Sequence, residues 1–183
     1  MSLRWIPNAI SLMRIALVLP VLFLLHRGEY GWALLLFWIA GLSDGVDGYL
    51  ASRFSWESRV GALLDPIADK LLIAGMFISL AFIGLIPLWL SAVVILRDLV
   101  IVGGATAYHL LIEPLQGEPT TVSKLNTMIQ LLFLLFVLCR ATFGWPERIA
   151  VTVLGAATLV TVVVSGIDYV LRWSRRARRG GMA

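Results

Sequence analysis

Four aspartates in an otherwise apolar sequence are the residues best suited to chemistry. Asp44 and Asp47 are followed by Gly48 and Ala51. The spacing i, i+3, i+4 and i+7 places all four on one face of a helix. Carboxylates in apolar segments are costly, and they persist where they face a cavity, a partner or an ion. This first pair therefore predicts a functional helix face.

The second pair of aspartates follows a short polar break. Asp65 and Asp69 lie four and eight residues after Gly61, again on one helix face. Because a short turn joins the two helices, we expect the four carboxylates to converge. Four anions in a low dielectric need cations, and oxygen ligands select hard ions such as Mg²⁺ or Mn²⁺. Two such ions are a recurring clamp in phosphoryl chemistry, so we predict a two-ion site for a phosphate-bearing substrate.

The composition places these residues in a membrane protein. Of 183 residues, 60% are hydrophobic and 14% are charged, and the mean hydropathy is +0.91; soluble domains are about 45–50% apolar and about 25% charged. The length suits one domain over residues 1–183. The net charge of +4 is concentrated in the tail, residues 172–183, where basic residues after an apolar helix predict a topology signal and contact with anionic lipids rather than with nucleic acid.

Six apolar stretches are long enough to cross a bilayer, which needs about 20 residues each. We therefore expect an all-α fold of six transmembrane helices, with an interfacial segment at the N-terminus. The apolar N-terminal stretch is interrupted by Arg14 and lacks a small-residue cleavage site, so we expect it to be a retained first helix. Basic residues favour one side, which predicts that both termini and the aspartates face the cytoplasm, in the manner of a bacterial inner-membrane protein. The expected helices cover roughly residues 6–26, 31–51, 60–83, 87–109, 122–143 and 148–173.

The aspartates and their neighbours resemble the motif of the CDP-alcohol phosphotransferases. That family carries D-x2-D-G-x2-A-R-x8-G-x3-D-x3-D, and this sequence matches it from Asp44 to Asp69 with one departure. The motif arginine is replaced by Ser52, and Arg53 follows directly. Either Arg53 contacts the cytidine nucleotide from one position later, or another basic residue does so. The resemblance covers essentially the whole chain and implies transfer of a phosphatidyl group from CDP-diacylglycerol to an alcohol, with release of CMP.

The resemblance also implies roles for individual residues. Asp44, Asp47, Asp65 and Asp69 would hold two divalent ions, Mg²⁺ or Mn²⁺, and Asp69 would also act as the general base. A larger set would contact the donor: Asn8, Ser11, Arg14, Gly48, Ala51, Ser52, Arg53, Ser58 and Gly61.

The acceptor is predicted from the fourth and fifth expected helices. Arg97 and Asp98 stand together in an apolar segment, so they should face the cavity or each other. A guanidinium suits phosphate recognition, and Lys124 and Asn126 open the next helix nearby. We therefore expect Arg97, Lys124 and Asn126 to bind the acceptor.

The sequence is compatible with two acceptor alcohols. The stretches "RDLVIVGGATAY" and "TTVSKLNTMIQL" resemble the CMP-forming cardiolipin synthases, whose acceptor is phosphatidylglycerol. The stretch "SGIDYVLRW" resembles the phosphatidylglycerophosphate synthases, which use glycerol 3-phosphate. We favour the first, because the fourth and fifth helices should line the acceptor pocket. A lipid acceptor requires a lateral opening to the bilayer, whereas a soluble acceptor requires only a polar mouth.

A different class of function is a transporter or ion pathway that uses intramembrane aspartates. Such proteins favour helices broken by glycine or proline in paired halves, whereas this sequence concentrates its acids in one hairpin. The small residues Gly103, Gly104, Ala105 and Ala107 form a face that favours close helix packing and is compatible with a homodimer.

Overall fold

The computed structural model is an assembly of helices, and it describes residues 6–54, 61–111 and 121–180. Side chains are described for residue 10 and for residues 12–43, 67–104 and 121–171. The described ranges contain no strand, which confirms the all-α prediction. The helices are α1 (Ile6–His26), α2 (Tyr30–Phe54), α3 (Gly61–Phe82), α4 (Leu88–Leu111), α5 (Thr121–Phe143) and α6 (Arg148–Gly180).

The helix ends agree with the expected ranges to within a few residues, except that α6 continues into the basic tail. It runs to Gly180, whereas the apolar pattern predicts an end near residue 173. Arginine is a good helix former, so the tail extends the helix without an apolar face. The expected interfacial N-terminal segment, residues 2–11, overlaps the start of α1, and residues 1–5 lie outside the described part of the chain.

Three glycines end α1, α3 and α5 at the same side of the bundle. Gly28, Gly84 and Gly144 have φ values of 76°, 79° and 72°, a left-handed conformation that glycine adopts without steric cost. After α3, the amide of Gly84 donates to Ala81 O at 3.1 Å and the amide of Leu85 donates to Leu80 O at 2.9 Å. This paired pattern satisfies the last carbonyls of the helix and turns the chain sharply.

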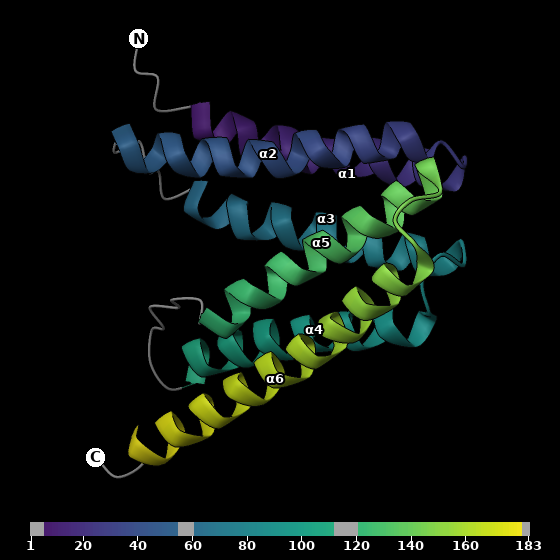
Figure 1. The fold of residues 1–183 in the computed structure, drawn as a ribbon. Coiled ribbons are helices and arrows are strands. Elements are labelled where there is room, and N and C mark those ends of the chain that lie inside the picture. The colour runs from purple at the N-terminus through teal and green to yellow at the C-terminus, as the bar shows by residue number, and fades with distance from the viewer. Residues whose placement is uncertain (1–5, 55–60, 112–120, 181–183) are drawn as a thin grey trace.

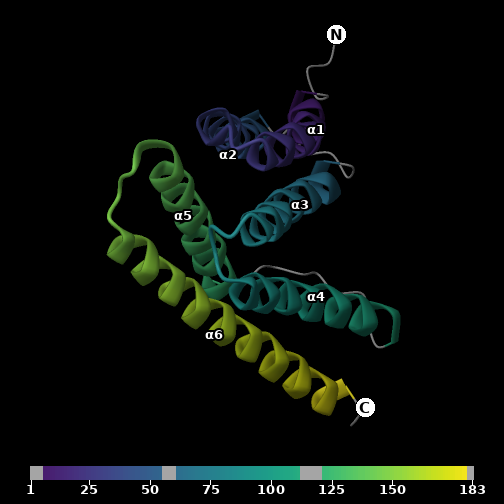
Figure 2. The same cartoon turned by 90° about the vertical axis from the view of Figure 1, so that its right-hand side faces the viewer.

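The six helices run back and forth between two ends of the molecule (Figure 1). The turn end carries the connections α1–α2, α3–α4 and α5–α6, and the terminal end carries both chain termini. Helix α1 packs against α2 and α3, while α5 contacts α2, α3 and α6, and α4 lies against α3 and α6 (Figure 2). The second half of α2 and the first turns of α3, which carry the predicted metal ligands, therefore lie toward the terminal end.

The apolar core lies mainly among α1, α2, α3 and α5. The rings of Phe77 and Phe133 stack with centroids 5.9 Å apart. At Gly75 an added Cβ would come within 3.1 Å of Leu22 Cδ1, so the glycine allows α1 and α3 to pack closely. Close packing fixes the distance between these two helices near the residues described below. Other fully buried core side chains are Val21, Leu25, Met76, Leu80, Leu134 and Leu138.

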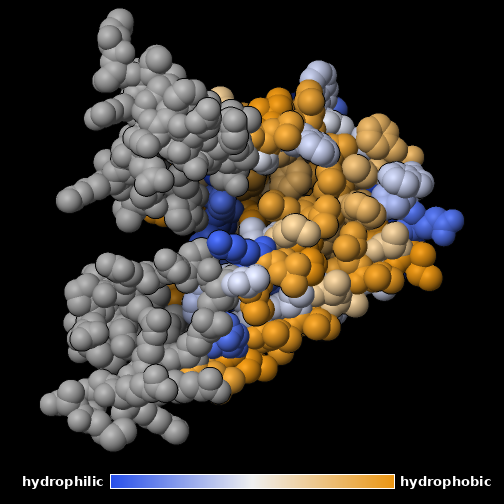
Figure 3. Space-filling view, turned by 60° about the vertical axis from the view of Figure 1, so that its left-hand side comes forward, coloured by the Kyte–Doolittle hydropathy of each residue, from blue (hydrophilic) through white to orange (hydrophobic). Residues whose placement is uncertain are grey.

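The outer surface of the described part is also apolar. Leu19 and Phe82 are 74% and 75% exposed, and hydrophobic side chains dominate the flank in Figure 3, while hydrophilic ones gather in a hollow. Among the described residues, 121–143 and 148–171 form helices long and apolar enough to cross a membrane. An exposed apolar surface of this extent indicates contact with lipid or with partners. Six transmembrane crossings remain a prediction.

Candidate active site

A partly buried ion pair joins α1 to α3. Arg14 is fully buried, and its Nη1 lies 2.5 Å from Oδ1 of Asp69, whose side chain is 37% exposed. A buried guanidinium requires a charged or hydrogen-bonding partner because leaving water is costly. The sequence predicts donor contact for Arg14 and catalysis for Asp69, and the structure brings these two residues together. Both roles remain predictions.

A polar cavity of about 440 Å³ begins at Asp69 and extends between α3, α4, α5 and α6. It contains residues predicted to bind the acceptor, Arg97 and Lys124, together with others that the sequence analysis did not single out. Basic and hydroxyl groups make this cavity suitable for a phosphate ester. Its polar and charged lining residues are Asp69, Lys70, Arg97, Asp98, Ser123, Lys124, Thr127, Gln130 and Tyr169.

Arg97 connects three helices at the edge of this cavity. Its Nη1 donates to Asp98 Oδ1 at 2.6 Å on α4, and its Nη2 donates to Ser123 Oγ at 3.1 Å on α5 and to Ser165 Oγ on α6. The residue is 9% exposed, and its Nε has no hydrogen-bond partner. The sequence offered pairing with Asp98 or exposure to the cavity as alternatives, and the side chain does both.

Asn126 and Gln130 place amide groups inside the bundle near this cavity. Asn126 is fully buried, and neither its side-chain nitrogen nor its oxygen has a hydrogen-bond partner. Gln130, one turn later, is 2% exposed, lines the cavity and has an unpaired Nε2. Each unpaired buried polar group costs about 1–3 kcal/mol. Asn126 does not line the cavity itself, so its predicted contact with the acceptor stays a prediction.

A second, apolar cavity of about 370 Å³ opens between α4 and α6. Val163 and Ile167 line it from α6, and Leu96 lines it from α4; these three side chains are 46%, 55% and 63% exposed. It is therefore a groove on the outer flank of the bundle, which we call the flank groove. Its single charged lining residue is Arg97, which also lines the polar cavity. One guanidinium thus lies between a polar interior and an apolar exterior.

Several site residues could have been found from the sequence, and others could not. Ser123 and Gln130 lie three residues before and four residues after Asn126 on α5, so they share its helix face, and that pattern was a usable signal. Ser165 is a single hydroxyl in an apolar helix, 68 residues from Arg97. Nothing in its local sequence links it to that guanidinium, because the contact depends on how α6 packs against α4.

Comparison with known proteins gives the family. Residues 4–165 match the CDP-alcohol phosphatidyltransferase family. The chain belongs to this family. CMP-forming cardiolipin synthases of Rattus norvegicus and Homo sapiens are each 33% identical to it over 181 residues, covering 90% of this chain and 60% of the relative. A probable phosphatidylglycerophosphate synthase of Mycobacterium tuberculosis (strain ATCC 25618 / H37Rv) is 32% identical over 175 residues, covering 90% of this chain and 79% of the relative.

This member of the family spans about 60% of the length of its rat and human relatives. Its apolar helices are consistent with association with a membrane, as are relatives whose names describe lipid synthesis. The names of the relatives divide between the two acceptors that the sequence left open.

Members of this family generally depend on divalent metal ions. Among the described residues no three His, Cys, Asp or Glu side chains form a metal-binding group. Three of the four predicted ligands, Asp44, Asp47 and Asp65, have side chains outside the described set. Asp69 fits the chemistry of a hard-cation ligand, since its carboxylate is partly exposed and lines the polar cavity.

The predicted donor contacts lie mostly outside the described side chains. Arg14 is the one that the structure describes, and Ser58 lies outside the described ranges altogether. The other donor-binding predictions concern residues whose helical backbone is described but whose side chains are not: Asn8, Ser11, Gly48, Ala51, Ser52, Arg53 and Gly61.

Proposed function

We propose that this protein transfers the phosphatidyl group of CDP-diacylglycerol to phosphatidylglycerol, giving cardiolipin and CMP. Family membership supports the reaction class, and the cardiolipin synthases among its relatives support the acceptor. The observation that carries the choice of acceptor is the position of Arg97, which lines both the polar cavity and the flank groove.

A lipid acceptor requires a polar site for its headgroup that is continuous with an apolar path for its chains. The polar cavity offers Lys70 and Lys124 beside Arg97, which suits a phosphodiester. The flank groove offers valine, leucine and isoleucine side chains that face outward. Phosphatidylglycerol then binds with its phosphate at Arg97, its headgroup inside and its acyl chains on the flank. A soluble acceptor has no use for such a groove.

In this proposal, Asp69 acts on the headgroup hydroxyl. Its carboxylate lines the same cavity as Arg97, and Arg14 holds one of its oxygens. In the proposed reaction Asp69 accepts the proton of the acceptor hydroxyl as that oxygen bonds to the phosphorus of the phosphatidyl group, and the bond from this phosphorus to CMP breaks. Divalent ions held by Asp44, Asp47, Asp65 and Asp69 would supply charge neutralisation for the donor pyrophosphate.

A second acceptor, glycerol 3-phosphate, is favoured by one observation. The Mycobacterium relative, named as a probable phosphatidylglycerophosphate synthase, shares 32% identity and is covered over 79% of its length. A cavity of about 440 Å³ is also large enough for a small phosphate ester. The two acceptors place the same phosphate chemistry at Arg97 and differ in whether the flank groove is used.

The test is a competition between the two acceptors. The purified protein receives labelled CDP-diacylglycerol with equal amounts of phosphatidylglycerol and glycerol 3-phosphate, and the labelled product is identified by chromatography. We expect cardiolipin. Phosphatidylglycerophosphate as the main product would replace the proposal with the alternative, and no CMP release in the presence of Mg²⁺ or Mn²⁺ would remove both.

A matched pair of variants tests the flank groove. Val163→Trp places a large side chain in the groove, whereas Val160→Trp makes the same change at an exposed valine of α6 that does not line it. We expect Val163→Trp to raise the apparent KM for phosphatidylglycerol about tenfold, a difference of about 1.4 kcal/mol. Val160→Trp should have no such effect. Equal behaviour of the two variants would show that the acceptor chains do not use the groove.

A further inference from the structure

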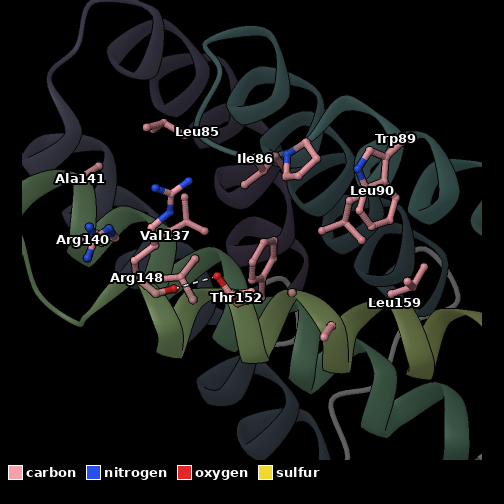
Figure 4. A pocket seen from close by; sticks show the side chains of 15 residues that line it. Leu85, Ile86, Trp89, Leu90, Val137, Arg140, Ala141, Arg148, Thr152 and Leu159 are labelled. Atoms are coloured by element: carbon pink, nitrogen blue, oxygen red, sulfur yellow. Dashed lines mark hydrogen bonds between the residues drawn. The ribbon is translucent and has the colours of Figure 1, made fainter.

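A third cavity, of about 580 Å³, lies at the turn end of the molecule between α4, α5 and α6. We call it the turn-end cavity. It shares no lining residue with the polar cavity or the flank groove. Its walls are mainly apolar, with Leu90 from α4, Val137 from α5 and Leu159 from α6 (Figure 4). Phe133 of α5 also lines it. The proposed transfer reaction makes no use of it.

Two arginines give this apolar cavity a positive charge. Arg140 is half-buried, and its Nη1 donates to the carbonyl oxygen of Pro146 at 2.8 Å, which fixes it at the α5–α6 turn. Arg148 is exposed, and its side chain extends from the first turn of α6 toward Leu85 and Ile86 (Figure 4). None of the described residues that line the cavity is acidic. Glu147, next in sequence to Arg148, is not among them.

The charges and the apolar walls are arranged along the helices. Arg140 and Arg148 stand next to the α5–α6 turn, while Phe133 and Leu159 lie about three helical turns from it along α5 and α6. Helices α5 and α6 are also the two that are long and apolar enough to cross a membrane. The turn between them therefore lies at a membrane surface, with the arginines at headgroup depth and the apolar walls at acyl-chain depth.

Gly155 allows close packing in the wall of the turn-end cavity. An added Cβ at this position would come within 3.2 Å of Cε2 of Phe133 and 3.8 Å of a methyl group of Leu90. The ring of Phe133 can therefore lie directly against the backbone of α6. Gly155, Phe133 and Leu90 all line the cavity, so this close contact forms part of its wall.

We propose that the turn-end cavity binds an anionic phospholipid as a structural ligand, on the side of the membrane opposite the active site. Its phosphate lies between Arg140 and Arg148, and an acyl chain follows Phe133 and Leu159 into the bundle. The volume is within the roughly 300–1,000 Å³ typical of ligand sites. Two uncompensated guanidinium groups favour a lipid with a net negative charge over a zwitterionic one. The bound lipid links α4 to the α5–α6 hairpin.

The test measures lipid binding by the purified full chain in detergent, using native mass spectrometry and the shift in melting temperature. The probe is dioleoyl phosphatidylserine, which is anionic but is not a substrate of the proposed reaction, and dioleoyl phosphatidylcholine is the zwitterionic comparison. We expect the first to bind about tenfold more tightly, which corresponds to one charge-assisted contact of about 1.4 kcal/mol.

Three variants locate the site. Arg148→Gln should lower the affinity for phosphatidylserine about tenfold, and Arg27→Gln, the same change at an exposed arginine of the α1–α2 turn, should leave it unchanged. Ala156→Trp, at an exposed position of the lining, should block binding by filling the cavity. Because Arg148 and Ala156 are both exposed, neither change disturbs the core.

Three results would overturn the proposal. They are equal binding of the two lipids by the unaltered protein, equal effects of Arg148→Gln and Arg27→Gln, and dissociation of a dimer by Ala156→Trp without loss of phosphatidylserine binding. The last would assign the cavity to a second copy of the chain. None of these measurements uses turnover, so failure here leaves the proposed reaction untouched, and failure of that reaction leaves this site untouched.

Discussion

The surroundings of Asp69 agree with its predicted role as a general base. It lines a polar cavity, and its position is fixed because Arg14 holds one oxygen from a fully buried position. A base must lie within hydrogen-bonding reach of the proton it removes, and a loosely held carboxylate would spend little time there. The ion pair with Arg14 therefore orients the carboxylate of Asp69.

Replacing Asp69 with asparagine tests this role. Asp69→Asn keeps the shape of the side chain but removes the proton acceptor, so we expect CMP release to fall by about 10²–10⁴-fold. Binding of labelled CDP-diacylglycerol, measured by filtration, should change much less, since the other predicted ligands remain. Turnover at a near-normal rate would show that another group takes the proton.

The buried amide of Asn126 supports a second prediction at the residue scale. Because neither its nitrogen nor its oxygen has a partner, Asn126→Leu should raise the free energy of unfolding by about 1–2 kcal/mol while lowering turnover. Thermal unfolding and CMP release measure the two effects. A loss of stability together with unchanged turnover would show that the amide has a structural role, and Leu134→Ala, an ordinary core truncation, provides the comparison for destabilisation.

At the scale of helices, α4, α5 and α6 meet at one guanidinium. Arg97 donates to Ser123 on α5 and to Ser165 on α6, so the relative positions of three helices determine where its charge lies. The residues of the polar cavity come from four helices. The proposed acceptor site therefore depends on interhelical hydrogen bonds, each of which contributes about 1 kcal/mol in membrane proteins.

Ser165→Ala removes one of these hydrogen bonds without changing the charge. We expect the apparent KM for phosphatidylglycerol to rise about threefold to tenfold with little change in kcat, because the guanidinium binds the acceptor in the ground state and the transition state alike. Ser165→Thr, which keeps the hydroxyl, should restore the lower KM. Ser91→Ala, at a buried serine of α4 outside the cavity, is the control. A fall in kcat alone would contradict the positioning role.

The helices were predictable because each is a long apolar segment between turn residues. Glycines at 28, 84 and 144 mark the ends of α1, α3 and α5 in the sequence, and the structure gives each a positive φ. The ion pair between Arg14 and Asp69 was not predicted, although both residues were, because it depends on the close approach of α1 and α3 that Gly75 allows. Contacts between helices far apart in sequence depend on packing, which local spacing does not encode.

At the scale of the molecule, the two ends of the bundle differ in chemistry. The polar cavity and the predicted metal ligands belong to the terminal half, and the turn end carries an apolar cavity with two arginines. In the predicted topology, the three turns α1–α2, α3–α4 and α5–α6 all lie on the side of the membrane opposite both termini.

Chemical labelling of introduced cysteines tests that topology. In a background of Cys139→Ala, single cysteines replace Glu29, Glu147 and Ala183. In intact bacterial cells a membrane-impermeant thiol reagent should label the first two, which lie in or beside turns, and should reach position 183 only after the cells are opened. Labelling of position 183 from outside would reverse the orientation, and different access to positions 29 and 147 would contradict six crossings.

The proposed use of the flank groove by the acceptor predicts how the reaction rate depends on the surroundings of the protein. A lipid acceptor that enters between α4 and α6 arrives by diffusion within the plane of the bilayer. Its relevant concentration is therefore its mole fraction among the neighbouring lipids. Diluting the bilayer with inert phospholipid should then slow the reaction, whereas diluting the whole suspension with buffer should not. In the proposed reaction the product carries four chains where the acceptor carries two, and it leaves by the same side.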